Sequence, residues 1–448
     1  MGKVGYRVTD GIAVVVLINP PTNALGADIR THLSARLTEA IANEAVDSIV
    51  LGAEGNLFCS GIDIREIGNV GTSKDTPDLS TICLQIEESA KPVFAAVQGN
   101  ALGGGAELAL AAHYRLAAPE TRIGLPEITL GVIPGCGGTQ RLPRLVGAEA
   151  ALNMLLSGRT VSGKDAKRLG LVDGLVNGDV LSAAFATAQD FQRRERKLPA
   201  TRIRRAGFKD PQLYMKAVIE RRQALSRSRY FAPGKVVDCV EAAFLLPFEA
   251  GLAFEETCFQ DCLEGPQSKA LRHAFLAERK IDRLLLEKTG TAGWTVTEAG
   301  ALVVDRLGLA FRAAIDHIAS LGPMPVRIDS ALLDFGFTKV PFGNKFPESK
   351  PGEDIARIQR RVVAALMAEG ARLVEKGVVA RTSDIDALAI HGIGFPRWRG
   401  GPMKAAELFG LAELSRDMER WAEESRIWSA PALLTHAAKD PKGFGGFF

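Results

Sequence analysis

Two glutamates in apolar surroundings, Glu107 and Glu127, are the residues of this sequence best suited by type and spacing to acid–base chemistry. Glu107 is the second residue of the run AELALAA, which we expect to be helical, and Glu127 follows Pro126 in GLPEITLG. Burial of a carboxyl group raises its pKa, so two such groups could exchange protons with a substrate near neutral pH. The alternative is structural: Glu107 could face solvent and be favoured there by the helix N-terminus.

Two glycine-containing turns could present backbone amides to a negatively charged oxygen. Gly103–Gly105 follows an expected strand and opens an expected helix, where N–H groups lack partners within the helix. Ser60 and Gly61 would form a tight turn that leaves the Ile62 amide free. One amide from each turn would make a two-donor oxyanion hole, although either turn could be purely structural. Neither turn has the G-x-G-x-x-G pattern of a dinucleotide site, and a Walker A loop is absent.

Alternating strands and helices must position these residues. We expect strands at 11–19, 47–52 and 92–98, a helix at 25–43, and a further helix from about Ala106. Short β-branched runs that alternate with amphipathic segments predict an α/β domain. From about Val240 onward the pattern is mostly helical, and the segment Lys288–Gly293 is the best candidate for a linker.

The size and composition of the chain are typical of a globular protein. It has 448 residues, 46% of them hydrophobic, and a net charge of +3, which does not favour a nucleic-acid partner. The length suggests about three domains. We expect a cytoplasmic protein without a membrane partner, because no signal peptide or bilayer-length apolar run is evident and the six cysteines are scattered. No metal site is expected.

A basic segment lies at residues 190–235, with 14 Lys and Arg against 4 Asp and Glu. It could be a solvated helical face, a subunit contact, or a surface that attracts an anionic ligand such as a phosphorylated cofactor.

Three motifs occur in order: FCSGIDI (58–64), NALGGGAEL (100–108) and LPEITLGVIPGCGGTQRL (125–142). Together they resemble the crotonase (enoyl-CoA hydratase/isomerase) superfamily, over roughly residues 1–260. The resemblance implies an α/β crotonase fold of spiral ββα type, with a core at 1–190 and a helical C-terminal or linker region at 191–288.

The resemblance also implies roles for individual residues. The backbone N–H groups of Ile62 and Gly104 would hold a thioester oxygen. Glu107 would activate water, Glu127 would handle the proton at C2, and Gly135 would help to seat the water. The coenzyme A moiety of the substrate would be lined by Asn23, Ala24, Leu25, Ser60, Asp63, Ile64 and Arg65.

The C-terminal part resembles a second group of proteins. Residues 251–280, 326–342 and 391–403 are similar to parts of the multifunctional enzyme type 1 and bacterial fatty-oxidation α-subunit families. Those families carry a Rossmann NAD-binding domain, for which the sequence between Lys280 and about Thr295 leaves no room. We therefore expect a shortened dehydrogenase C-terminal-like helical domain at 295–345, a second such domain at 350–448, no NAD and no dehydrogenase activity. His391 is then expected to be a packing residue.

These expectations favour a 2-enoyl-CoA hydratase that adds water in syn fashion to a trans-2-enoyl-CoA. The sequence does not separate this activity from Δ3–Δ2 enoyl-CoA isomerisation. Two alternatives stay open: another CoA lyase or hydrolase of the superfamily, and a non-catalytic subunit of a fatty-acid oxidation assembly. The expected partner is an acyl-CoA, with coenzyme A as part of the substrate and no tightly bound cofactor, and the expected state is a monomer or small homo-oligomer.

Overall fold

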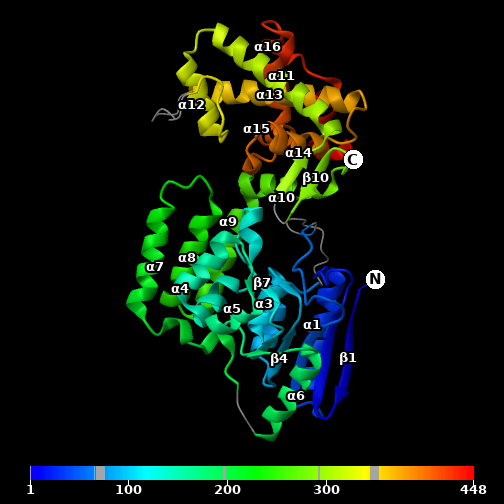
Figure 1. The fold of residues 1–448 in the computed structure, drawn as a ribbon, viewed down its shortest axis with the longest axis vertical. Coiled ribbons are helices and arrows are strands. Elements are labelled where there is room, and N and C mark those ends of the chain that lie inside the picture. Colours follow the sequence, from blue (N-terminus) through cyan, green and yellow to red (C-terminus); the bar gives the residue numbers. More distant parts are fainter. Residues whose placement is uncertain are drawn as a thin grey trace. The chain divides into compact units, whose positions relative to one another are not determined.

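The chain forms two compact units, Met1–Glu264 and Gly265–Phe448. The computed structural model in Figure 1 describes residues 2–64, 66, 76–194, 198–290, 293–343 and 353–447. The division between the units falls inside the segment 191–288, which the sequence analysis assigned to a linker region.

A six-stranded sheet forms the base of the first unit. Its strand order is β1-β2-β3-β4-β6-β9; β1 and β2 are antiparallel and the later neighbours are parallel. The bounds are β1 Lys3–Thr9, β2 Ile12–Ile18, β3 Ser48–Ala53, β4 Val93–Val97, β6 Tyr114–Ala117 and β9 Gly174–Leu175. All residues of β3 and β4 are buried, as is usual for parallel strands covered on both faces. The three strands expected from the sequence are confirmed.

A second, smaller sheet precedes the segments that carry the candidate functional residues. Its order is β5-β7-β8, with β5 at Asn100–Leu102, β7 at Arg122–Gly124 and β8 at Val161–Ser162. Helix α3 (Gly104–Ala111) begins directly after β5, and all eight of its residues are buried. The 3-10 helix η1 (Pro126–Leu130) begins soon after β7. The two short strands therefore carry Glu107 and Glu127 into neighbouring positions, since β5 and β7 pair in parallel.

Further helices pack on the sheets and on one another. They are α1 Ala27–Ala42, α2 Leu79–Glu87, α4 Gly138–Ser157, α5 Gly163–Leu169, α6 Val180–Arg193, α7 Pro211–Ala224, α8 Ala232–Leu245 and α9 Phe248–Glu264. Two further 3-10 helices lie at Thr201–Ile203 and Ala206–Phe208. The Asp78 side chain accepts a 2.6 Å hydrogen bond from the Thr81 amide and thereby caps α2. In the part of this unit that the structure describes, the helix expected at 25–43 is confirmed as α1.

The second unit is mainly helical. Its elements are α10 Pro266–Lys280, β10 Leu286–Thr289, β11 Gly293–Val296, α11 Glu298–Ser320, α12 Pro325–Phe335, α13 Glu353–Glu375, α14 Thr382–Gly392, α15 Pro402–Phe409, α16 Leu411–Ala422 and α17 Ala432–Ala437. Short 3-10 helices lie at Arg397–Arg399, Arg426–Trp428 and Gly443–Phe447. The core of this unit gathers around α13. The expected linker at Lys288–Gly293 is wrong, because Lys288 and Thr289 belong to β10, Gly293 begins the paired strand β11, and the division between the units falls after Glu264.

His391 belongs to a polar cluster of the second unit. Its Nε2 lies 3.1 Å from Glu278 Oε1, and Arg397 donates two hydrogen bonds to the same carboxylate. Burial acts to raise the pKa of Glu278, but the bonds from His391 and Arg397 outweigh it and lower that pKa to about 2. These contacts fit the expected packing role of His391. Among the described residues, no helix has the length and apolar character needed to cross a membrane.

Candidate active site

A cavity of about 390 Å³ lies within the first unit. The turn at 60–62, the start of α3, and η1 each contribute lining residues. The loop before α4, one side of α9, the start of α2 and Arg30 of α1 also line it. Glu107 and Glu127 both line this cavity, together with Ile62, Gly104 and Gly135. The structure therefore brings together the five residues to which the resemblance assigned chemistry.

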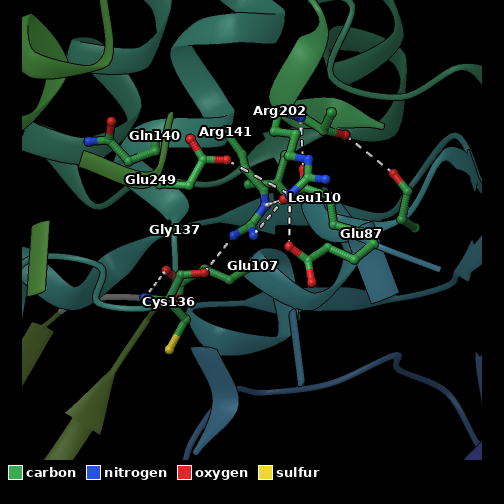
Figure 2. A network of polar contacts seen from close by, with 12 residues as sticks. Glu87, Glu107, Leu110, Cys136, Gly137, Gln140, Arg141, Arg202 and Glu249 are labelled. Carbon is green, nitrogen blue, oxygen red and sulfur yellow. Dashed lines mark hydrogen bonds and ion pairs between the residues drawn. The ribbon is translucent and has the colours of Figure 1, made fainter. Parts of the chain in front are cut away.

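Glu107 is held by the loop that precedes α4 (Figure 2). The backbone amides of Cys136 and Gly138 donate hydrogen bonds of 2.8 and 2.9 Å to its Oε1 atom. Burial raises the pKa of Glu107 above its usual value, and the two amides act against that shift. The solvent-facing alternative is wrong, because the residue is only 2% exposed. The two amides fix the carboxyl group in place and leave it able to accept a proton.

Glu127 has a different environment. Its Oε2 atom is buried without a hydrogen-bond partner in the described structure. Burial, followed by the charge of Glu107, raises the pKa of Glu127 well above its usual value. A carboxyl group in this environment is favoured in its protonated form. The pair thus contains one carboxyl group that accepts two amide hydrogen bonds and one that is poised as an acid.

Two glycines keep the Glu127 and Glu107 carboxyl groups close to the main chain. A Cβ atom on Gly103 would lie 2.9 Å from Glu127 Oε1, and one on Gly138 would lie 2.8 Å from Glu107 Oε1. Gly103 also has a φ angle of +52°, which disfavours other residues. A larger residue at either position would therefore displace the neighbouring carboxyl group.

The amides of Ile62 and Gly104 lie near one another. A Cβ atom on Gly104 would be 3.6 Å from the Ile62 nitrogen, and a Cβ atom on Gly61 would be 3.2 Å from the Gly104 nitrogen. Gly104 is the first residue of α3, so its N–H is not needed by the helix's own hydrogen bonds. Gly61 has a φ angle of +93°, which only glycine adopts readily. This arrangement suits a two-donor site for one oxygen atom.

Helix α9 closes the cavity on the side of Gly135. A Cβ atom on Gly135 would lie 2.9 Å from the Phe259 ring. Glu256, Gln260 and Leu263 of the same helix also line the cavity. The sequence analysis missed the contribution of α9. The run FEETCF contains two adjacent glutamates on an amphipathic helix, and this was the one available signal.

Only some of the residues expected to contact coenzyme A line the cavity. Ser60 and Ile64 line the cavity, whereas Asn23, Ala24, Leu25 and Asp63 are not among its lining residues. Asn23 is buried, and its side-chain amide donates to the carbonyl oxygens of Glu54 and Leu57 at 2.9 and 3.0 Å. Arg65 lies outside the described residues. A contact of these residues with coenzyme A stays a prediction.

The basic segment 190–235 does not reach the cavity. None of its described residues lines the cavity wall. Arg204 pairs with Asp173 at 2.8 Å, and Arg222 pairs with Asp238 and Glu241. These ion pairs neutralise part of the segment within the first unit itself. In the described parts of the chain, no group of three or more His, Cys, Asp or Glu residues is arranged to hold a metal ion.

Comparison with known families assigns both units. Residues 7–201 match the model of the enoyl-CoA hydratase/isomerase family, and residues 358–442 match that of the 3-hydroxyacyl-CoA dehydrogenase C-terminal domain. The chain therefore carries a crotonase-family domain of the enoyl-CoA hydratase/isomerase class, followed by a helical dehydrogenase C-terminal domain.

The chain is similar to parts of several known proteins. The peroxisomal bifunctional enzyme of Homo sapiens is 38% identical over 281 residues, which cover 62% of this chain and 38% of that protein. A peroxisomal fatty acid beta-oxidation multifunctional protein of Oryza sativa is 38% identical over 60% of this chain and 38% of its own length. A carnitinyl-CoA dehydratase structure from Mycobacterium avium is 26% identical, with a TM-score of 0.47, and covers 61% of this chain and 97% of that one. The chain spans well under half the length of the two curated relatives.

Proposed function

We propose that this protein is a 2-enoyl-CoA hydratase that adds water in syn fashion across the double bond of a trans-2-enoyl-CoA. One observation carries the proposal: the buried Glu107, the half-buried Glu127 with its buried Oε2 atom, and two neighbouring amides, of Ile62 and Gly104, line the same cavity. Membership of the enoyl-CoA hydratase/isomerase family supports it.

The steps follow from the environments of these groups. The amides of Ile62 and Gly104 bind the thioester oxygen and stabilise the enolate that forms when the double bond is attacked. Glu107 takes a proton from water, and the resulting hydroxide forms a bond to C3. Glu127, whose pKa is raised further, gives its proton to C2. Proton exchange between the two carboxyl groups and solvent then restores the starting state.

Isomerisation of a Δ3 to a Δ2 double bond is a second reaction that the same groups could catalyse. It requires one carboxyl group to move a proton from C2 to C4, and Glu127 has the buried, unpartnered Oε2 atom suited to that task. The oxyanion site would serve both reactions, because both pass through an enolate. The alternative, another CoA lyase or hydrolase reaction, could use the same oxyanion site and water-activating carboxyl group, and the mass of the product distinguishes it from hydration.

The activity is tested by adding short, medium and long trans-2-enoyl-CoA substrates and following the loss of the enoyl absorbance. Mass analysis should identify 3-hydroxyacyl-CoA, one water heavier than the substrate. Appearance of Δ2 product from a Δ3 substrate would add the isomerase activity. If all chain lengths are left unchanged by the purified protein, the proposed function is wrong.

We further propose that the protein has no NAD-dependent dehydrogenase activity. Only five residues separate α10 from β10, and the β10–β11 hairpin follows directly. Formation of NADH from NAD and a 3-hydroxyacyl-CoA would contradict this. We also propose that the protein acts as a monomer or small homo-oligomer. A cytoplasmic location stays a prediction, and the named relatives are peroxisomal.

A further inference from the structure

A third buried carboxyl group, Glu255, lies behind the cavity and has no part in the proposed reaction. It belongs to α9, is 1% exposed, and faces the loop that joins the cavity to α4. The Gly137 amide donates a 2.5 Å hydrogen bond to its Oε1 atom, and the Thr139 amide donates a 2.8 Å hydrogen bond to its Oε2 atom. The Thr139 hydroxyl group also donates to Oε2. Burial of a carboxyl group is costly, and these three bonds offset that cost.

Successive backbone amides at residues 136–139 donate in turn to two different carboxyl groups. The amides of Cys136 and Gly138 donate to Glu107, and the amides of Gly137 and Thr139 donate to Glu255. Successive amides that point to opposite sides require a fixed backbone, and Gly137 accordingly has a φ angle of +93°. Loss of the bonds on one side would release the loop, and the amides on the other side would then change direction.

Other contacts of α9 act on the same loop. Phe259, one helical turn beyond Glu255, packs against Gly135, where a Cβ atom would lie 2.9 Å from its ring. On the preceding turn of α9, Leu252 lies 3.1 Å from the position of a Cβ atom on Gly137. Helix α9 thus contacts the loop at three successive turns, and Glu255 makes the polar contacts.

We propose that Glu255 is a positioning residue that aims the Cys136 and Gly138 amides at Glu107 and so sets the place of the water-activating carboxyl group. The expected effect on catalysis rests on the proposed function. The expected effect on the position of Glu107 does not.

The test compares Glu255→Gln with Glu264→Gln, an exposed position on the same helix that does not line the cavity. A glutamine has one acceptor oxygen, so one of the two amides would face an NH2 group. We expect Glu255→Gln to lower kcat by about tenfold to hundredfold while KM stays within about threefold, because a small displacement of a catalytic group is costly. Glu264→Gln should retain the wild-type values.

Crystal structures of the wild type and the variant supply a readout independent of activity. In Glu255→Gln, the distances from Glu107 Oε1 to the Cys136 and Gly138 nitrogens should lengthen from 2.8 and 2.9 Å. Unchanged distances, or lengthened distances with an unchanged kcat, would overturn the proposal. If the wild type hydrates no enoyl-CoA, the proposed function is wrong. The distances alone then decide whether Glu255 positions the two amides. If Glu255→Gln does not fold, Glu255→Asp replaces it, with lengthened contacts expected and unchanged contacts overturning the inference.

Discussion

Arg141 and Glu87 form an ion pair in which both side chains are completely shielded from solvent. Arg141 Nη2 lies 2.9 Å from Glu87 Oε2 (Figure 2). Arg141 also donates a 2.7 Å hydrogen bond to the Cys136 carbonyl oxygen, and the Arg202 amide donates one of 2.8 Å to Glu87. The pair therefore joins α2 and α4 to the loop that holds Glu107, so its loss should affect both folding and catalysis.

Glu87→Gln should strongly destabilise the first unit. The substitution leaves the Arg141 guanidinium group buried without its counter-ion, which costs about 3–5 kcal/mol in the free energy of unfolding. Urea unfolding followed by circular dichroism measures this cost. The matched control is Glu120→Gln, at the exposed Lys164–Glu120 pair, where we expect a change below about 1 kcal/mol. Equal changes at the two positions would contradict the expectation.

Substitution of either proposed catalytic carboxyl group should remove most activity. Glu107→Gln and Glu127→Gln keep the size of the side chain but remove its proton transfer. We expect each to lower kcat for enoyl-CoA hydration by about 10²–10⁴-fold. Glu44→Gln, at an exposed position, should leave kcat unchanged. Should either variant retain more than a tenth of the wild-type kcat, that residue does not have the assigned role.

Gly61→Ala tests the two-amide site. The new methyl group would lie 2.8 Å from the Leu102 carbonyl oxygen and 3.2 Å from the Gly104 nitrogen, so the Gly104 amide must move. Gly55→Ala is the matched control, since Gly55 also has a positive φ angle but has no atom within 4 Å of an added Cβ. Both variants should lose about 1–2 kcal/mol of stability from backbone strain. Only Gly61→Ala should also lose activity, and equal activities would argue against an oxyanion site here.

The buried carboxyl groups should make the protein less stable as the pH rises. Burial and the neighbouring Glu107 raise the pKa of Glu255 to about 8, whereas an unfolded chain has its usual value near 4.5. The protonated form therefore favours the folded state fully below pH 4.5, and this contribution is lost as the pH rises toward 8. The pKa of Glu127 is raised by burial and by Glu107, and its contribution has the same sign.

The measurement compares the melting temperatures of the wild type and Glu127→Gln between pH 5 and 8. The uncharged glutamine cannot ionise, so the variant should gain stability relative to the wild type as the pH rises. His113 has a pKa lowered to about 4 by burial and by Arg115 and Arg204, and it acts in the opposite direction. His113 is present in both proteins, and its effect cancels in the difference. A difference that does not vary with pH would show that Glu127 is not protonated preferentially in the folded state.

The sequence predicted the centre of the site better than its outer wall. Glu107 and Glu127 lie in distinct motifs, and their placement in one site rested on the resemblance to the crotonase superfamily, since the paired strands β5 and β7 that bring them together were not expected. Glu255 lies more than a hundred residues further along the chain, and its contact with the 136–139 loop depends on how α9 packs. Local patterns do not report such long-range packing. Asn23 is an opposite case, in which the sequence suggested a ligand contact. In the structure its side-chain amide donates to two main-chain carbonyl oxygens.

Helix α9 has a consequence for how the protein should behave when diluted. The wall that it contributes belongs to the same polypeptide as the residues facing it, and every described lining residue lies before Gly265. We therefore expect catalysis not to require a residue from a second copy. Specific activity should accordingly stay constant from micromolar to nanomolar protein, whether or not the chains associate.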